Sequence, residues 1–193
     1  MRSFAMIVTL TGPSGVGKGY LTAQLQSALG AKIVPWTTTR PARPDDTSTN
    51  NRRFVTREEF DLMQSEGLLI GVQNLHGYKY GLEQTFLGMT DREGTYVCEI
   101  NSANVLTLFP VIYRRFSIAL VTDDSQLLKE RIQKREPNVG SVELTDRLET
   151  AVREVGLVRA NAFLFHLQIN VDICHESAVA SIAIEAIRKG VGI

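Results

Sequence analysis

The chain has 193 residues, and its 21 basic and 21 acidic side chains give a formal net charge of zero. That balance predicts no general attraction to nucleic acid or to an anionic membrane, and no run approaches the roughly 18 apolar residues that a membrane span needs. The hydrophobic fraction of 44% is ordinary for one compact α/β domain.

The first expected element is a strand over residues 4–10, FAMIVTL, followed by a glycine-rich loop and a helix over 19–30. An apolar run that leads straight into such a loop has no small-residue cleavage site, so we expect a buried strand and not a secretory signal. The loop GPSGVGK (12–18) has the phosphate-binding pattern G-x-x-x-x-G-K. Its glycines let backbone N–H groups turn around phosphates, and Lys18 supplies the charge that follows a transferring phosphoryl group.

The next residue departs from this pattern, because Gly19 stands where a serine or threonine normally coordinates magnesium. Magnesium often keeps several waters and uses one or two carboxylates beside phosphate oxygens. Glu99, at the end of the expected strand 94–100, has the position of a Walker-B-type carboxylate and is our candidate for holding Mg²⁺ through water. The alternative is a solvated glutamate at a strand end. The loop therefore predicts ATP binding and leaves metal affinity open.

An insertion follows the first helix. The polar segment 37–53 is punctuated by prolines and opens a region that extends to about residue 90. Within it, Thr56 is a predicted N-cap for a helix over 56–67, with Glu59 completing a capping box.

The later elements resume the alternation of strands and helices, which predicts a parallel sheet covered by helices. Pro137 and Gly140 separate two of these helices, as is typical of a lid hinge. The expected strands are 94–100, 115–121 and 163–170, and the expected helices are 124–136, 142–161 and 175–189. Cys98 and Cys174 lie in apolar runs, which predicts inert core thiols and a cytoplasmic protein.

Several short motifs follow one another along nearly the whole chain: GPSGVGKG (12–19), TTTRPAR (37–43), GYKYG (77–81), CEIN (98–101), RIQKRE (131–136), DRLETA (146–151) and QIN (168–170). In order and spacing they resemble the guanylate kinase family. The resemblance implies a P-loop NTPase three-layer α/β fold with a parallel central sheet, an inserted nucleoside-monophosphate-binding flap and a lid. We expect one domain, with its core at 1–34 and 91–193, the flap at about 35–90 and the lid at about 135–146.

On the donor side, the resemblance implies catalytic roles for Lys18, Arg135 and Arg147, and Arg131 could join them. For Arg131 and Arg147 the alternative is a solvated helix face paired with glutamates. Asn170 matches the residue near the donor adenine. The nucleotide-binding residues would be Gly12, Pro13, Ser14, Gly15, Val16, Gly17, Lys18, Gly19 and Asn170.

On the acceptor side, family enzymes grip a monophosphate with two arginines and two tyrosines. Arg40, Arg43 and Tyr80 match three of these, and Arg52 occupies the fourth position. Two arginines in a proline-rich loop could instead be solubilising surface.

The positions that read guanine in the family are largely changed. They hold Trp36, Gly71, Leu82 and Asn101, with Thr37 beside the first of them. Thr37 and Asn101 remain candidate acceptor ligands, but the lost carboxylate predicts poor guanine specificity.

Two hypotheses follow. The first is an ATP- and Mg²⁺-dependent phosphotransferase acting on a small phosphate-bearing acceptor. Family membership would make GMP the default acceptor, whereas the residues of the acceptor site predict a non-guanine nucleotide or a sugar phosphate. Ribose bisphosphokinases, which share the fold and also replace the hydroxyl residue after the loop lysine, support the latter. The second is a guanylate-kinase-like binding module that has lost catalysis, which Gly19, Gly71 and Leu82 favour.

Overall fold

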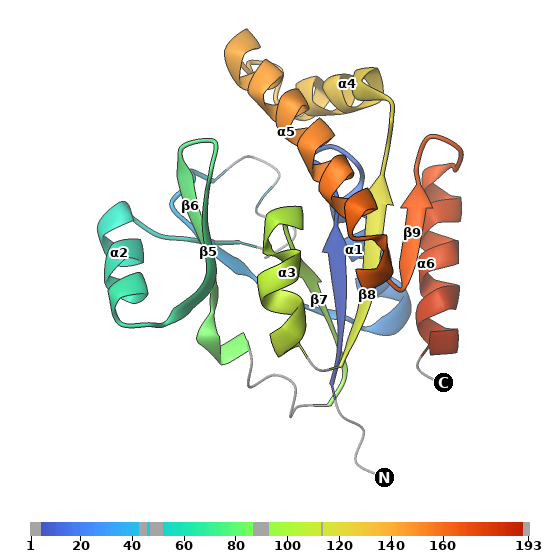
Figure 1. The fold of residues 1–193 in the computed structure, drawn as a ribbon, viewed down its shortest axis with the longest axis horizontal. Coiled ribbons are helices and arrows are strands. Elements are labelled where there is room, and N and C mark those ends of the chain that lie inside the picture. Colours follow the sequence, from blue (N-terminus) through green and yellow to red (C-terminus); the bar gives the residue numbers. More distant parts are fainter. Residues whose placement is uncertain (1–4, 43–45, 47–51, 87–92, 113, 191–193) are drawn as a thin grey trace.

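The computed structural model describes residues 5–42, 46, 52–86, 93–112 and 114–190. Its centre is a five-stranded, fully parallel sheet with the order β2-β7-β1-β8-β9 (Figure 1). The strands are β1 Met6–Thr11, β2 Lys32–Ile33, β7 Thr95–Glu99, β8 Arg115–Val121 and β9 Leu167–Asn170. Because all strands run the same way, their carboxyl ends meet at one edge of the sheet, where ligands bind in open α/β folds.

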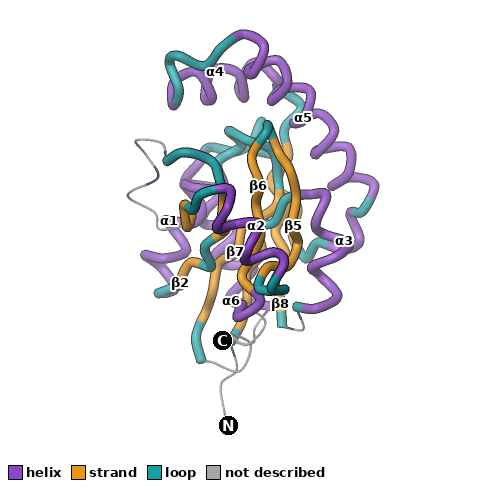
Figure 2. Tube along the Cα trace, turned by 90° about the vertical axis from the view of Figure 1, so that its left-hand side faces the viewer, coloured by secondary structure: helices purple, strands orange, loops and turns teal. Residues whose placement is uncertain are grey.

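Helices cover both faces of this sheet, and Figure 2 shows the layers from the side. The helices around it are α1 Lys18–Leu29, α3 Val105–Leu108, α4 Ser125–Arg135, α5 Ser141–Ala160 and α6 Glu176–Gly190. Successive strand residues point to opposite faces. In β1, Val8 and Leu10 pack with residues of α1 and α6, whereas Ile7 packs on the opposite side with Leu108 of α3. The predicted three-layer α/β fold is confirmed.

A second sheet lies beside the first, with the order β4-β3-β6-β5. Its elements are β3 Trp36–Thr38, β4 Arg52–Phe54, α2 Arg57–Ser65, β5 Leu69–Leu75 and β6 Tyr78–Glu83. Trp36, Leu82 and Phe86 are buried in the same apolar cluster as Ile7 and Ile100 of the central sheet. This shared cluster attaches the second sheet to the first. We call this second sheet with α2 the flap; its limits as a moving unit stay a prediction.

The helix α2 shows how local sequence signals define an element. The Thr56 hydroxyl accepts from the Glu59 N–H at 3.1 Å, and the Glu59 carboxylate accepts from the Thr56 N–H at 2.7 Å. The predicted capping box is therefore present, and it satisfies two N–H groups that the helix cannot bond internally. Asp124 caps α4 in a similar way, by accepting from the Leu127 N–H at 2.9 Å.

One predicted element is wrong in its first half. The expected strand 163–170 begins as a 3-10 turn over Ala162–Leu164, and β9 starts only at Leu167. The N–H of Phe165 bonds back to the carbonyl of Ala162, and the Phe163 side chain is 81% exposed. The apolar run is therefore shared between a surface turn and a short strand.

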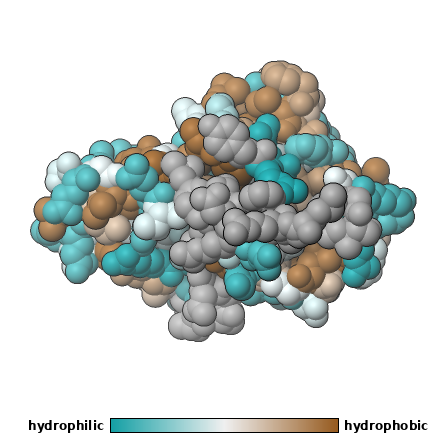
Figure 3. Space-filling model, turned by 90° about the horizontal axis from the view of Figure 1, so that it is seen from below, coloured by the Kyte–Doolittle hydropathy of each residue, from teal (hydrophilic) through white to brown (hydrophobic). Residues whose placement is uncertain are grey.

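The two cysteines are free, but only Cys98 is fully buried, whereas Cys174 is half-buried. Burial raises the pKa of the Cys98 thiol, which makes it an unreactive core residue. Within the described part of the chain, none of the helices combines the length and apolar character required to cross a bilayer. Figure 3 views the end of the molecule below the sheet, where hydrophilic and hydrophobic side chains are intermingled.

Candidate active site

A cavity of about 520 Å³ opens above the carboxyl ends of the central strands, between the flap and the helices α4 and α5. Its size is in the ordinary range for a small-molecule site. Most of the predicted site residues line it: Gly12, Ser14, Gly15, Gly17, Lys18, Gly19, Arg40, Arg52, Tyr80, Glu99, Asn101, Arg135 and Arg147. The topology thus gathers residues from five separated parts of the sequence into one hollow.

The phosphate loop joins β1 to α1 at the floor of this cavity. Gly12 has φ of 147°, and a Cβ there would lie 2.3 Å from the Leu120 carbonyl oxygen, so only glycine fits. Gly17 precedes α1 without a side-chain cap, which leaves N–H groups of the first turn for an anion. Lys18 donates to the carbonyls of Gly12 at 2.6 Å and Pro13 at 3.0 Å. Burial lowers the pKa of Lys18, opposed mainly by the charge of Glu99.

Glu99, at the end of β7, lies beside the loop and is not a solvated strand end. Its side chain is 15% exposed, and its Oε2 is 3.1 Å from Nη2 of Arg52 in the flap. Burial acts to raise the pKa of Glu99, but the charges of Arg52 and Lys18 outweigh it and lower the pKa. The carboxylate is therefore ionised and already engaged by a cation.

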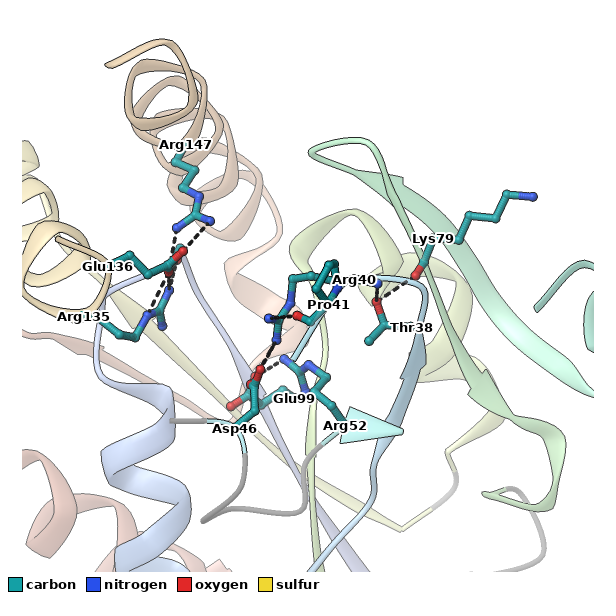
Figure 4. Close-up of polar contacts among 11 residues, drawn as sticks. Thr38, Arg40, Pro41, Asp46, Arg52, Lys79, Glu99, Arg135, Glu136 and Arg147 are labelled. Carbon is teal, nitrogen blue, oxygen red and sulfur yellow. Dashed lines mark hydrogen bonds and ion pairs between the residues drawn. The ribbon is translucent and has the colours of Figure 1, made fainter. Parts of the chain in front are cut away.

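The acceptor side holds a second arginine close to the first (Figure 4). Arg40 is 7% exposed, and its Nη2 lies 2.9 Å from both carboxylate oxygens of Asp46. Thr38 fixes the local chain, since its hydroxyl accepts from the Arg40 N–H at 3.1 Å. Arg40 is thus a buried, positioned cation and not solubilising surface. Arg43 lies outside the described residues.

The side of the cavity formed by α4 and α5 holds two more arginines, Arg135 and Arg147, which both contact Glu136; we call it the lid side, after the predicted lid at about 135–146. Arg147 of α5 donates to both carboxylate oxygens of Glu136, at 2.9 and 3.1 Å, and to Glu143 at 2.5 Å. Arg135 of α4 donates to Glu136 at 3.0 Å and reaches the Ser14 hydroxyl of the phosphate loop at 3.5 Å. The structure therefore brings Arg135 and Arg147 together beside the loop. The solvated-face alternative does not describe Arg147, whose side chain is 3% exposed.

Neutral and acidic side chains also line the cavity. Asn101 donates from Nδ2 to Oε1 of Glu154 in α5 at 2.7 Å, and accepts from the Ala103 N–H at 2.8 Å. Burial raises the pKa of Glu154, opposed mainly by Lys18. Gln73 lines the same cavity from β5.

Gly71 marks an irregularity between β5 and β6 and has φ of 59°. A Cβ there would lie 3.0 Å from a methyl of Leu108, so no larger side chain fits without displacing it. Gly71 has no side chain, so position 71 supplies no carboxylate to the cavity.

Some predicted residues are not among the described residues that line the cavity: Pro13, Val16, Thr37 and Asn170. Val16 packs in the core, and the buried Thr37 hydroxyl donates to Glu83 at 3.4 Å. Asn170 lies at the same edge of the sheet, where its side-chain oxygen accepts from the Asp172 N–H. Arg131 lines the cavity but approaches the loop carbonyls of Gly15 and Val16 at 3.4 Å.

The alternative for Arg131 and Arg147 paired them with glutamates, but the sequence did not identify which acids contact the site arginines. Glu136 follows Arg135 directly, and Glu143 lies four residues before Arg147, which places Glu143 and Arg147 on one face of α5. These short separations in sequence indicate that the arginines and acids can form ion pairs. Asp46 gave no such signal, because it lies in a polar loop without periodicity.

Comparison with known proteins agrees with this geometry. The guanylate kinase family model matches residues 5–158. The chain belongs to the guanylate kinase family. A guanylate kinase from Streptococcus agalactiae serotype III is 30% identical over 162 residues, which cover 82% of this chain and 77% of that protein. One from Lactococcus lactis subsp. lactis is 29% identical, with 82% and 78% covered. Membership makes this chain an enzyme of the nucleoside monophosphate kinase type.

Solved structures agree on the fold. A guanylate kinase from Anaplasma phagocytophilum superposes with a TM-score of 0.73 at 19% identity, covering 98% of this chain and 87% of the other. A gluconokinase from Sinorhizobium meliloti gives a TM-score of 0.55 at 15% identity, covering 97% and 94%. At these identities the likeness establishes the P-loop fold and nothing finer.

The residues present fit a magnesium ion only in one way. Gly19 offers no side-chain oxygen, and among the described residues no group of three or more His, Cys, Asp or Glu gathers as a metal site. Glu99 is a hard oxygen donor at the right edge of the sheet, although Arg52 contacts it. The metal would therefore be held by the nucleotide, by water and by Glu99 at most.

Proposed function

We propose that this protein transfers the γ-phosphoryl group of ATP to a phosphate-bearing small molecule, with GMP as the default acceptor of its family. The observation that carries the proposal is the pairing of two arginine groups across one cavity beside Lys18. Arg40 and Arg52 lie on the flap side, and Arg135 and Arg147 lie on the lid side. Such a reaction suits a cytoplasmic protein with free thiols.

The donor phosphates would lie on the loop, where the N–H groups of Gly15 to Lys18 and the start of α1 offer positive potential. Lys18 now bonds to carbonyls of its own loop and would exchange them for phosphate oxygens. Arg135 and Arg147 would leave Glu136 for the transferring group, because a guanidinium fork matches its spread charge. Catalysis then rests on positioning and charge neutralisation.

Magnesium and ATP are the cofactors of this proposal. When bound, Mg²⁺ would neutralise charge on the donor phosphate oxygens. Glu99 is the protein group that would orient its water. Asn170 would lie towards the donor base, at the carboxyl end of β9.

The acceptor phosphate would bind Arg40, Arg52 and Tyr80, with Arg43 in the same segment of sequence. The base end of the cavity offers Asn101, Gln73 and Glu154, whereas position 71 is closed by Leu108. Guanine presents two adjacent N–H groups that need an acceptor, and an unmet donor costs about 1–3 kcal/mol. A non-guanine nucleotide or a sugar phosphate is therefore the alternative acceptor.

A coupled assay of ADP release tests the proposal with GMP, dGMP, AMP, UMP and ribose phosphates, each with and without Mg²⁺. We expect turnover of at least one acceptor, and a loss of roughly a hundredfold or more in Lys18→Ala. Lys134→Ala is the matched control, since that lysine is exposed on α4. If no acceptor is phosphorylated while ATP still binds, the binding-module hypothesis that Gly19 and Gly71 favour replaces this one.

A further inference from the structure

An ion pair between Arg52 and Glu99 connects the flap to the central sheet beside the cavity. Arg52 begins β4 in the flap, and Glu99 ends β7 in the central sheet, 47 residues later in the chain. Their Nη2 and Oε2 atoms are 3.1 Å apart, and their side chains are only 19% and 15% exposed. Figure 4 shows this pair next to Arg40 and Asp46, on the acceptor side. The contact therefore fixes the flap to the sheet at the edge where the phosphate loop lies.

Trp36 holds both partners in place. It is opposite Arg52 in the pairing of β3 with β4, and its indole Nε1–H donates to the backbone carbonyl of Glu99. Trp36 is 3% exposed, so this support is rigid. The next residue of β4 is different, because Arg53 is 55% exposed and pairs with Glu83 of the flap itself. Arg52, and not Arg53, therefore contacts the central sheet.

Arg52 and a bound magnesium ion would compete for the carboxylate of Glu99. Glu99 is the acid that the fold offers to magnesium, and Gly19 removes the other side-chain ligand. A guanidinium hydrogen-bonded to a carboxylate must be displaced or turned before a metal-bound water can use that oxygen. Arg52 also lies in the acceptor cavity, where a phosphate dianion would attract it more strongly than one carboxylate does.

Resting on the proposed function, we propose that Arg52 and Glu99 form a switch between the two substrates: Arg52 withholds Glu99 from donor magnesium until an acceptor phosphate draws the guanidinium away. Acceptor phosphate then strengthens the preference for magnesium-bound nucleotide, and by linkage magnesium nucleotide strengthens the binding of acceptor phosphate to the same extent.

Calorimetric titration with AMP-PNP, which undergoes no transfer, tests the switch without turnover. The quantity to compare is the magnesium preference, the ratio of the Kd for AMP-PNP alone to the Kd with excess Mg²⁺. We expect Arg52→Gln to raise this ratio about fivefold or more. Arg53→Gln is the matched control, with the same change one residue along the strand, and should leave the ratio unchanged. In a Glu99→Gln background, Arg52→Gln should have no effect on the ratio.

A second arm adds inorganic phosphate as the acceptor probe. Phosphate should raise the magnesium preference of the wild type and leave that of Arg52→Gln unchanged. An equal ratio in wild type and Arg52→Gln, or an equal rise with phosphate in both, would overturn the switch. If the wild type binds no AMP-PNP in either condition, the proposed function fails and the switch fails with it. If AMP-PNP binds normally but the magnesium preference changes neither with Arg52→Gln nor with phosphate, only the switch is ruled out.

Discussion

The lid and the flap hold their arginines in different ways. On the lid side, Arg135 and Arg147 both donate to the carboxylate of Glu136, Arg147 donates to Glu143 as well, and Arg135 is 34% exposed. On the flap, Arg40 pairs with Asp46 and Arg52 pairs with Glu99, and both arginines are largely buried. Arg40 and Asp46 belong to one segment, whereas Arg52 reaches across to the central sheet.

This difference indicates two modes of phosphate binding. Because Glu136 contacts both lid arginines, a phosphoryl group that takes its place can recruit both, with Arg147 exchanging its bond to Glu143 as well. The flap arginines are fixed before any ligand arrives, which suits a group that must select and orient an acceptor. We therefore expect lid substitutions to affect the chemical step and flap substitutions to affect acceptor binding.

Arg147→Gln should have the largest effect in this comparison. Loss of a charge that stabilises the transferring group lowers kcat by roughly a hundredfold, with a much smaller change in acceptor KM. Steady-state kinetics with the best acceptor measure both constants. Arg153→Gln, exposed on the same helix, is the control and should behave as wild type. A higher acceptor KM at unchanged kcat would show that Arg147 binds the acceptor and does not act in the chemical step.

Arg40→Gln should show the opposite pattern. We expect the acceptor KM to rise about tenfold or more, with kcat at saturation changed less, because a buried charge-assisted contact to the acceptor phosphate is lost. The same kinetics measure it, and Arg57→Gln on the exposed surface of α2 is the control. An unchanged KM would mean that the acceptor phosphate binds elsewhere.

Glu136→Gln should have a smaller effect, on nucleotide affinity. It tests whether Glu136, which contacts both lid arginines, competes with phosphate for them. Without its charge, both lid arginines are held less strongly, with Arg147 keeping its bond to Glu143, and AMP-PNP should bind a few-fold more tightly. Calorimetry measures the Kd, with Glu130→Gln on the exposed face of α4 as control. Weaker binding would show that Glu136 positions the lid arginines and does not compete with phosphate.

Glu154→Gln changes a buried acid of α5 that lines the cavity, and its expected effect is on stability. Burial raises the pKa of Glu154, so the folded protein keeps this proton to higher pH than the unfolded chain does. The stability contributed by this group therefore falls as pH rises from the ordinary carboxyl range through the folded pKa. The variant removes that titration and keeps an oxygen for Asn101.

We expect its thermal midpoint to exceed that of the wild type by a few degrees near about pH 8, with the difference narrowing towards about pH 4. Calorimetric melting across pH measures this, and Glu149→Gln, exposed on α5, is the control. A difference that does not change with pH would assign the effect to packing.

The features that sequence predicted well are governed by local chemistry. The phosphate loop, the capping box at Thr56 and the strand at 115–121 depend on short patterns of glycine, capping side chains and apolar residues. The features it missed depend on long-range pairing. Nothing near Arg52 in sequence indicates Glu99 as its partner, and nothing near Gly71 indicates that Leu108 fills its side-chain space.

The central claim is that the two arginine groups act on neighbouring phosphates of two substrates. Its most direct test is the affinity of a dinucleotide in which adenosine and guanosine are joined by a pentaphosphate chain, measured by calorimetry in wild type, Arg40→Gln and Arg147→Gln. We predict that the wild type binds it more tightly than AMP-PNP and that each substitution weakens it about tenfold or more. Equal affinity in all three proteins would contradict the claim.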